Sequence, residues 1–239
     1  MHHEKERTEM KKRFAVSTVL MSTALVLGTT TAWAATSTGE STAKITFTTN
    51  EAPVIVDPDD RDPNNPYEPD KNGGNTPTGN TGALTLDYAP NFDFGSNELL
   101  SNKAEFKATD QKPFLQVTDR RVNRTEWEVT VKLGDFIDEG GKPSLIGSTL
   151  SIDAGTVQTL VNVSGFAAPT TGDITLTPGN AGDAQTILTS PEGTFSTWQI
   201  YWKGNGTDND YIKLNVPINS QVQGTHTATL DWTLTDVVN

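Results

Sequence analysis

The stretch HTATLDWTLTDV, residues 226–237, alternates apolar and polar side chains along most of its length. Successive side chains of a β-strand point to opposite faces, so residues two apart share a face. One face of this stretch carries Ala228, Leu230, Trp232 and Leu234, and the other carries threonines and Asp231. The pattern therefore predicts a strand with one side in a hydrophobic core.

Two further stretches repeat this arrangement, EWEVTVKL at residues 126–133 and STWQIYW at residues 196–202. The tryptophans of each fall on the same face as aliphatic residues, and two interpretations of them are open. The rings either lie inside the domain, where each buries about 150–250 Å², or form an exposed platform that stacks on a ligand such as a glycan. The candidate motif and binding residues are Trp127, Val129, Trp198, Trp202, Trp232 and Leu234.

The chain from residue 83 to residue 239 is a succession of short alternating segments separated by Gly, Asn and Pro. None of these segments has a sustained helical period, and threonine and valine are abundant. Many short strands at such spacing are typical of an all-β fold. We predict one antiparallel β-sandwich or barrel-like domain over residues 83–239.

The region before this domain has a different composition. Residues 57–82 are rich in Pro, Asn, Gly and Asp, and they predict a disordered acidic linker because they offer little apolar area to bury. The acids of this linker lack the ligand spacing of a calcium loop, so we interpret them as solvated charges. Within residues 35–56, the alternation at residues 45–48 predicts one short strand.

The N-terminus has the three parts of a secretory signal peptide. A basic cluster at residues 11–13 precedes an apolar run over residues 14–27, and Ala32-Trp33-Ala34 provides a cleavage site before Ala35. The run is shorter than the roughly 20 residues that a membrane-spanning helix needs. We expect residues 1–34 to be removed, the rest to be exported, and no membrane insertion after cleavage.

Charge and cysteine content restrict the partners and the mode of attachment. Removal of residues 1–34 leaves 13 Lys and Arg against 27 Asp and Glu, a net charge of −14. Nucleic acid and anionic lipid are repelled by such a chain. The sequence has no cysteine, hence no disulfide and no lipid-modified cysteine, and it contains no LPxTG sequence. We expect any attachment to a surface to be noncovalent.

The motifs and their order resemble those of small WxL-domain proteins of the Gram-positive cell surface. The resemblance is carried by four stretches: ALTLDYAPNFDFGS (83–96), FLQVTDRR (114–121), EWEVTVKL (126–133) and HTATLDWTLTDV (226–237). Trp232-Thr233-Leu234 is a full match to the motif at the C-terminal end of the domain. The first motif reads Trp127-Glu128-Val129, with Val in place of Leu.

The resemblance implies a secreted, noncatalytic protein that is held noncovalently at the cell wall by binding peptidoglycan through this domain. It also implies partners among WxL-type or WxL-recognising surface proteins, and in some cases host extracellular matrix proteins. An alternative keeps the fold but makes the chain an adhesin or scaffold module that binds a wall-anchored or host protein rather than peptidoglycan.

The residues needed for catalysis are sparse. The chain after residue 34 has one histidine, His226, no cysteine and no GxSxG sequence. A glycosidase that uses two carboxylates is a remote alternative, with candidates at Asp87, Asp93, Asp119 and Asp135. We therefore expect no catalytic residue, no cofactor and no metal site.

Overall fold

The computed structural model describes residues 39–46, 52–68, 75–179 and 184–237. The chain divides into two compact units, Met1–Thr46 and Phe47–Asn239. The described part of the first unit, residues 39–46, is exposed and carries no strand. The strand predicted over residues 45–48 is therefore not formed at Ile45 and Thr46, and its other half lies outside the described residues, as does the predicted signal peptide.

The regular secondary structure described in the second unit is almost all β, which confirms the predicted all-β antiparallel class. Its described residues form 14 strands and one short 3₁₀ turn at Ile218–Ser220. The strands are β1 (Leu84–Tyr88), β2 (Glu105–Ala108), β3 (Phe114–Asp119), β4 (Trp127–Leu133), β5 (Ile137–Asp138), β6 (Thr149–Ile152), β7 (Thr156–Thr159), β8 (Thr170–Thr171), β9 (Ile174–Leu176), β10 (Gln185–Ser190), β11 (Ser196–Tyr201), β12 (Asn209–Asn215), β13 (His226–Thr227) and β14 (Leu230–Asp236). No helix among the residues described is long and apolar enough to cross a membrane.

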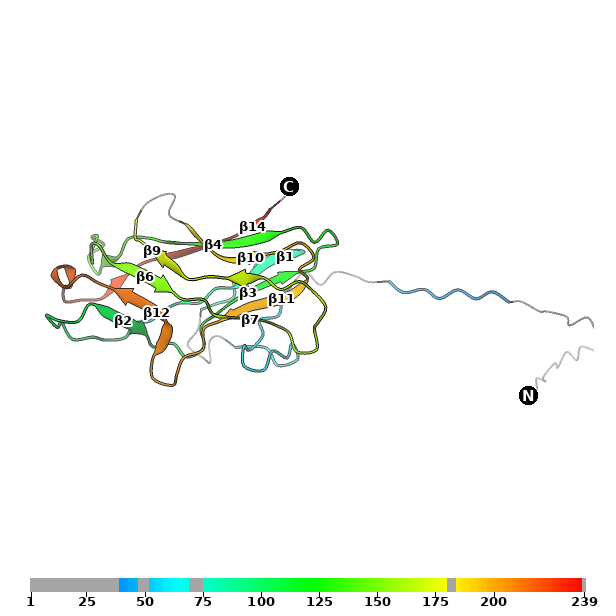
Figure 1. Cartoon of the computed structure of the whole chain (residues 1–239), viewed down its shortest axis with the longest axis horizontal. Coiled ribbons are helices and arrows are strands. Elements are labelled where there is room, and N and C mark those ends of the chain that lie inside the picture. Colours follow the sequence, from blue (N-terminus) through cyan, green and yellow to red (C-terminus); the bar gives the residue numbers. More distant parts are fainter. Residues whose placement is uncertain (1–38, 47–51, 69–74, 180–183, 238–239) are drawn as a thin grey trace, which may run out of the picture. The chain divides into compact units, whose positions relative to one another are not determined.

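The strands form three four-stranded antiparallel sheets and a small two-stranded one (Figure 1). We call the sheet with the order β14-β4-β10-β8 the motif sheet, because it carries two of the tryptophan motifs. The strap sheet, named for residues 53–58, whose backbone is hydrogen-bonded to it, has the order β1-β3-β11-β7. The third sheet has the order β2-β12-β6-β9. Strands β13 and β5 pair separately. Sequence neighbours are rarely sheet neighbours, so the sheets are built from distant segments.

One hydrophobic core joins the three large sheets. It includes Trp127 and Val129 of the motif sheet, Leu115 of the strap sheet and Ile212 of the third sheet, none of which has an exposed side chain. The alternation of β4 produces this directly, because every second residue from Trp127 to Leu133 is buried. Burial of apolar area stabilises a fold by roughly 25 cal/mol per Å², and in a chain without disulfides this term dominates.

A second, smaller hydrophobic cluster lies on the strap sheet and differs from the sequence prediction. Ile55 and Tyr67 pack there against Tyr88, Phe114 and Tyr201. The Tyr67 ring meets the Phe114 ring edge-on, with centroids 5.0 Å apart. The predicted disordered linker, residues 57–82, thus begins with a segment that is docked on the domain. Composition missed this because the apolar contacts come from Ile55, which lies just before the linker, and from one tyrosine within it.

Candidate functional site

The two strands that match the family motif are direct neighbours. Strand β14 pairs antiparallel with β4, so that Trp232 lies opposite Val131 and Leu234 lies opposite Val129. The motif tryptophans themselves are offset, because Trp127 lies opposite Asp236. Residues of an antiparallel pair that lie opposite each other share a face of the sheet. The two motifs, about a hundred residues apart in sequence, therefore form one continuous patch.

The inward face of this patch is buried to different degrees along the sheet. Trp127 and Val129 are 0% exposed. Trp232 and Leu234 are half-buried and pack against the edge of the same core. The difference follows from position, since β4 has a strand on both sides and β14 has one neighbour only. The interior interpretation therefore holds fully for Trp127 and partly for Trp232.

The other two candidate tryptophans lie in or beside β11. Trp202 is fully buried and its indole Nε1 donates to the carbonyl oxygen of Asp153 at 2.9 Å. Trp198 is buried and donates to the carbonyl oxygen of Phe195 at 2.8 Å. Buried indoles normally find such an acceptor. Neither ring forms an exposed platform, so among the candidates only Trp232 keeps part of its ring accessible.

The outward face of the motif sheet is polar and rich in hydroxyl groups. Thr130 of β4 lies between Thr233 of β14 and Thr186 of β10 in one row across three strands. The next row places Glu128 between Thr235 and Thr189. We call these residues the threonine face: Thr130, Thr186, Thr189, Thr233, Thr235 and Glu128. All are exposed or half-exposed. The alternation of residues 126–133 and 226–237 in the sequence placed Glu128, Thr130, Thr233 and Thr235 on polar faces and made the face of Thr233 a candidate contact, whereas Thr186 and Thr189 were missed.

The chemistry of the threonine face is hydrogen bonding. Each hydroxyl offers one donor and two acceptor positions, and Glu128 adds a carboxylate that accepts from the Thr186 hydroxyl at 3.2 Å. Beyond the two rows, Asp231 lies opposite Lys132. The face is thus suited to a flat ligand that is rich in hydroxyl or amide groups.

A shallow groove runs beside the threonine face. Its volume is about 340 Å³. One wall is strand β14 and the other is strand β1 with the residues just before it. The lining residues are Asn80, Thr81, Leu84, Thr85, Leu86, Trp232, Thr233 and Leu234. The groove therefore exposes the accessible parts of the C-terminal motif next to polar groups.

The end of β14 is held by a charged cluster. Arg121 pairs with Asp119 at 2.8 Å and with Asp236 at 2.5 Å, and it also donates to the carbonyl oxygen of Thr125 at 2.7 Å. The hydrogen bond from Arg121 holds the pKa of Asp236 below its usual range. Charge-assisted contacts of this kind fix the position of an edge strand that would otherwise fray. Asp119 is fully buried, and its carboxylate accepts two hydrogen bonds from the Arg121 guanidinium.

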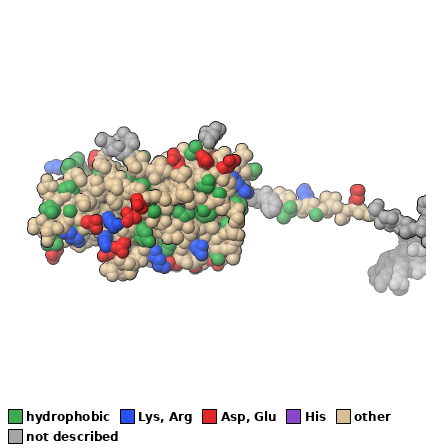
Figure 2. All heavy atoms as spheres, in the orientation of Figure 1, with side chains coloured by type: hydrophobic (Ala, Val, Ile, Leu, Met, Phe, Trp, Pro, Cys, Tyr) green, Lys and Arg blue, Asp and Glu red, His purple; other side chains and the backbone are tan. Residues whose placement is uncertain are grey.

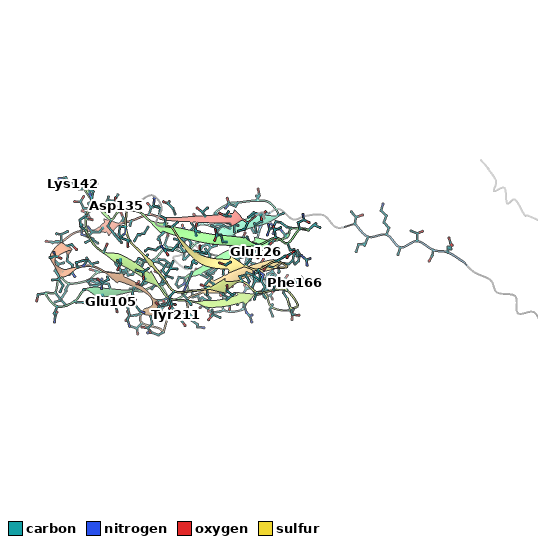
Figure 3. The ribbon with its side chains drawn as sticks, turned by 45° about the horizontal axis from the view of Figure 1, so that its top comes forward. Glu105, Glu126, Asp135, Lys142, Phe166 and Tyr211 are labelled. Carbon is teal, nitrogen blue, oxygen red and sulfur yellow. The ribbon has the colours of Figure 1, made fainter. Side chains whose placement is uncertain are left out.

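A larger cavity of about 670 Å³ opens near the loops that follow β4. Figure 3 labels Asp135 and Lys142 at this end of the unit, and Phe166 lies at the opposite end. The apolar lining includes Phe92, Phe136 and Leu145, and His226 lies at its wall. His226 belongs to β13, and its ring Nδ1 contacts the Ser144 hydroxyl at 2.9 Å.

The carboxylates proposed for a glycosidase occupy different environments. Asp87 is 1% exposed, and burial raises its pKa above the usual value. It accepts hydrogen bonds from Thr85, Gln116 and Thr118. Asp93 caps a turn by accepting from the backbone N–H of Gly95. In the part of the chain that is described, no group of three or more His, Cys, Asp or Glu residues is placed to hold a metal ion.

Comparison with known proteins identifies the domain. A family model described as "WxL domain surface cell wall-binding" matches residues 34–237, which is all of the chain except its first 33 and last two residues. Searches of curated proteins and of solved structures gave no match. The family match covers both motif strands and every sheet described above. The chain therefore belongs to the WxL domain surface cell wall-binding family.

Proposed function

We propose that this protein is secreted and noncatalytic, and that it is retained at the cell wall by noncovalent binding of peptidoglycan to the threonine face. The observation that carries the proposal is the position of the motif in the sheet. Its middle residue, Thr233, points outward into a row of threonines, while Trp232 and Leu234 point toward the core. The apolar motif residues then act by anchoring the two strands to the core, and the residues between them contact the ligand.

The energetics of such a face favour an extended polymer. A single hydrogen bond contributes only about 0.5–1.5 kcal/mol net, so one sugar or one peptide amide on one threonine binds weakly. Several rows of hydroxyls contacted by one chain act together, because the first contact raises the effective concentration for the next. A repeating wall polymer meets this requirement, and a small free ligand does not.

Charge also favours peptidoglycan over an anionic polymer. The chain after residue 34 carries a net charge of −14. Figure 2 shows acidic and basic side chains side by side on the visible face, without a large basic patch. A strongly anionic ligand would be repelled at long range by the net charge. A glycan crosslinked by peptides is bound through hydroxyl and amide groups and escapes most of this repulsion.

The experiment is a sedimentation assay with purified peptidoglycan that has been stripped of protein and accessory polymers. The test variant combines Thr130→Val and Thr233→Val, which remove two adjacent hydroxyls at almost constant volume. The matched control is Thr175→Val, an exposed threonine of β9 on the third sheet. We expect the double variant to stay in the supernatant and the control to sediment like the parent chain.

Two results would contradict the proposal. The parent chain remaining in the supernatant while native walls retain it would exclude direct peptidoglycan binding. The double variant sedimenting normally, with an unchanged melting temperature, would exclude the threonine face. Release of soluble sugar fragments in the same tube would instead support a glycosidase.

One observation favours a second candidate function. The cavity of about 670 Å³ has an apolar lining, and Leu99 and Val222 on its rim are 57% and 53% exposed. Exposed apolar residues around a concavity are typical of protein-binding surfaces. An adhesin or scaffold role toward a WxL-recognising surface protein or a host matrix protein would use this end. Leu99→Ser would then abolish capture of that protein and leave sedimentation with peptidoglycan unchanged.

A further inference from the structure

Strand β14 is a long edge strand with none of the usual protection. It lies outermost in the motif sheet and has seven residues, whereas the other outermost strands of the three large sheets have two to five. Its register with β4 runs without a shift from Leu230 to Asp236. Edge strands are normally blocked against further pairing by Lys, Pro or a β-bulge. The sequence of β14, LDWTLTD, contains neither residue, and its pairing contains no bulge.

The register of β14 shows which of its backbone groups face the open side. The carbonyl oxygen of Thr229 accepts from the Gly134 N–H at 2.8 Å, and the Val237 N–H donates to the Glu126 carbonyl oxygen at 3.0 Å. Bonded and non-bonded positions alternate along an antiparallel pair, so every second residue from Thr229 to Val237 is bonded to β4. The backbone N–H and C=O groups that point away from β4 include those of Leu230, Trp232 and Leu234. We call these groups the open edge.

The neighbouring edge strand, β1, is covered by the chain that precedes it. The backbone N–H of Thr78 donates to the carbonyl oxygen of Asp87 at 3.0 Å, and the Asn80 side chain donates to that of Leu86 at 3.0 Å. The register of β1 also shifts after Leu86. Among the residues that the structure describes, no such bond covers the open edge of β14. The two adjacent edges are therefore treated differently, and only that of β14 is left for pairing.

The side chains beside the open edge add an apolar and an acidic element. The groove of about 340 Å³ runs along this side of β14, and accessible parts of Leu84, Trp232 and Leu234 line it. On the outward face, Asp231 is exposed and forms no ion pair within the described part of the chain. Opposite charges that face each other across two strands attract. A segment with apolar side chains toward the groove and a cation beside Asp231 complements both elements.

We propose that β14 binds an extended segment of a partner protein, which joins the motif sheet as an additional antiparallel strand and carries a Lys or Arg opposite Asp231. The spacing of the open edge favours a polypeptide. Its N–H and C=O groups recur at every second residue, about 6.8 Å apart, and an extended peptide offers complementary groups at the same spacing. Residues that bond to β4 form non-hydrogen-bonded pairs on the other side of β14, where side chains lie closer together. Asp231 is such a residue.

This site differs from the threonine face that we propose for peptidoglycan. Strand addition uses backbone groups of Leu230, Trp232 and Leu234, whereas the threonine face uses the side chains of the residues between them. The net charge of −14 for the chain after residue 34 also attracts a cationic segment at long range. The motif then has two roles, since its side chains anchor β14 to the core and its backbone receives the partner.

Amide hydrogen exchange, measured residue by residue with NMR, tests the open edge in the unmodified chain. Amides bonded to β4, such as those of Asp231 and Thr233, should exchange slowly. The amides of Leu230, Trp232 and Leu234 should exchange fast, which gives an alternating pattern along the strand. Equal protection of all five amides would mean that the edge is already occupied, and it would overturn the proposal.

A tethered probe then tests strand addition. A flexible Gly/Ser linker after Asn239 carries the sequence VTVKL, which copies residues 129–133. These residues pair with Leu230–Leu234 on the other side of β14 and place a Lys opposite Asp231. The tether holds the probe at an effective concentration in the millimolar range. We expect exchange at Leu230, Trp232 and Leu234 to become several-fold slower than in a chain that carries the linker alone.

Three matched controls make the outcome decisive. The probe VTPKL has no N–H at its central position and should give the exchange rates of the linker alone. The probe VTVEL should bind roughly two- to fivefold more weakly than VTVKL, and Asp231→Lys should reverse that order. The double variant Thr130→Val with Thr233→Val should keep the protection by VTVKL, which separates this result from peptidoglycan binding. No slowing with VTVKL, equal slowing with VTPKL, or no preference between Lys and Glu would overturn the proposal.

Discussion

Replacing each of two fully buried tryptophans by phenylalanine tests how hydrogen bonding, separate from burial, stabilises this core. Trp127 and Trp202 are both 0% exposed and both belong to the main core cluster. They differ at the indole nitrogen. Trp202 Nε1 donates to the carbonyl oxygen of Asp153 at 2.9 Å, whereas Trp127 Nε1 is buried and has no acceptor among the described residues.

The expected difference follows from this contrast. Both changes remove similar apolar volume, so the cavity contribution nearly cancels between them. Trp202→Phe additionally loses a hydrogen bond with a net value of about 0.5–1.5 kcal/mol. Trp127→Phe removes an unsatisfied buried donor, whose presence costs about 1–3 kcal/mol. We therefore expect Trp202→Phe to be the more destabilising change by about 1.5–4.5 kcal/mol.

The measurement is urea-induced unfolding of the parent chain and of both variants, with the free energy of unfolding taken from the midpoint and slope. In a domain of this size, 1 kcal/mol shifts the melting temperature by about 2–4 °C, so the variants should melt at least several degrees apart. Equal destabilisation, or a greater loss for Trp127→Phe, would refute the reasoning. It would mean that the Trp127 nitrogen finds an acceptor or that packing differs between the two sites.

Three other predictions concern burial, close packing and charge. Trp232→Ala should lower the free energy of unfolding by less than the roughly 3–5 kcal/mol expected for a fully buried tryptophan, because the Trp232 side chain is half-buried. Thermal unfolding of this variant and of Trp127→Ala, compared with the parent chain, measures the difference. Gly155→Ala should destabilise the fold by about 1–3 kcal/mol, since the new Cβ would lie 2.8 Å from the Trp202 side chain. Its control, Gly172→Ala, would place a Cβ with no atom within 4 Å and should be nearly neutral in the same assay. The pKa of Asp87 is raised in the folded chain by burial. Protonation of Asp87 therefore stabilises the folded state, and this stabilisation is lost as pH rises through the raised pKa. Asp87→Asn should therefore gain stability relative to the parent chain with rising pH, as measured by urea unfolding across the acid range, and a parallel pH dependence of the two chains would contradict this.

The threonine face and the glutamine-bearing face of the strap sheet give the same molecule two kinds of polar surface. On the motif sheet, the hydroxyls of Thr130 and Thr233 face solvent and have room for a ligand. On the strap sheet, Gln116 and Gln199 are buried and already bonded. Both arise from the polar half of an alternating strand. They differ only in whether another segment of the chain covers them.

The alternation of apolar and polar residues determined which side chains of the motif strands face the core. The alternation of residues 226–237 placed Trp232 and Leu234 together toward the core, and that of residues 126–133 did the same for Trp127. These assignments succeed because the two-residue period of a strand is a property of the backbone itself. The motifs and their order also indicated the family that the comparison confirmed.

The tertiary structure decided the pairing and the edge positions of the strands, which the two-residue alternation alone does not specify. A strand pattern specifies two faces, but not which strand becomes an edge, and only the edge position of β14 leaves Trp232 half-exposed while Trp127 is buried. The pairing of β4 with β14 joined the two motifs and aligned their threonines into rows. The docking of residues 53–58 depended on glutamines from three strands. Contacts between segments so far apart are set by the packing of the whole core. The composition of residues 57–82 is a local property and does not contain these contacts, so it predicted a disordered linker.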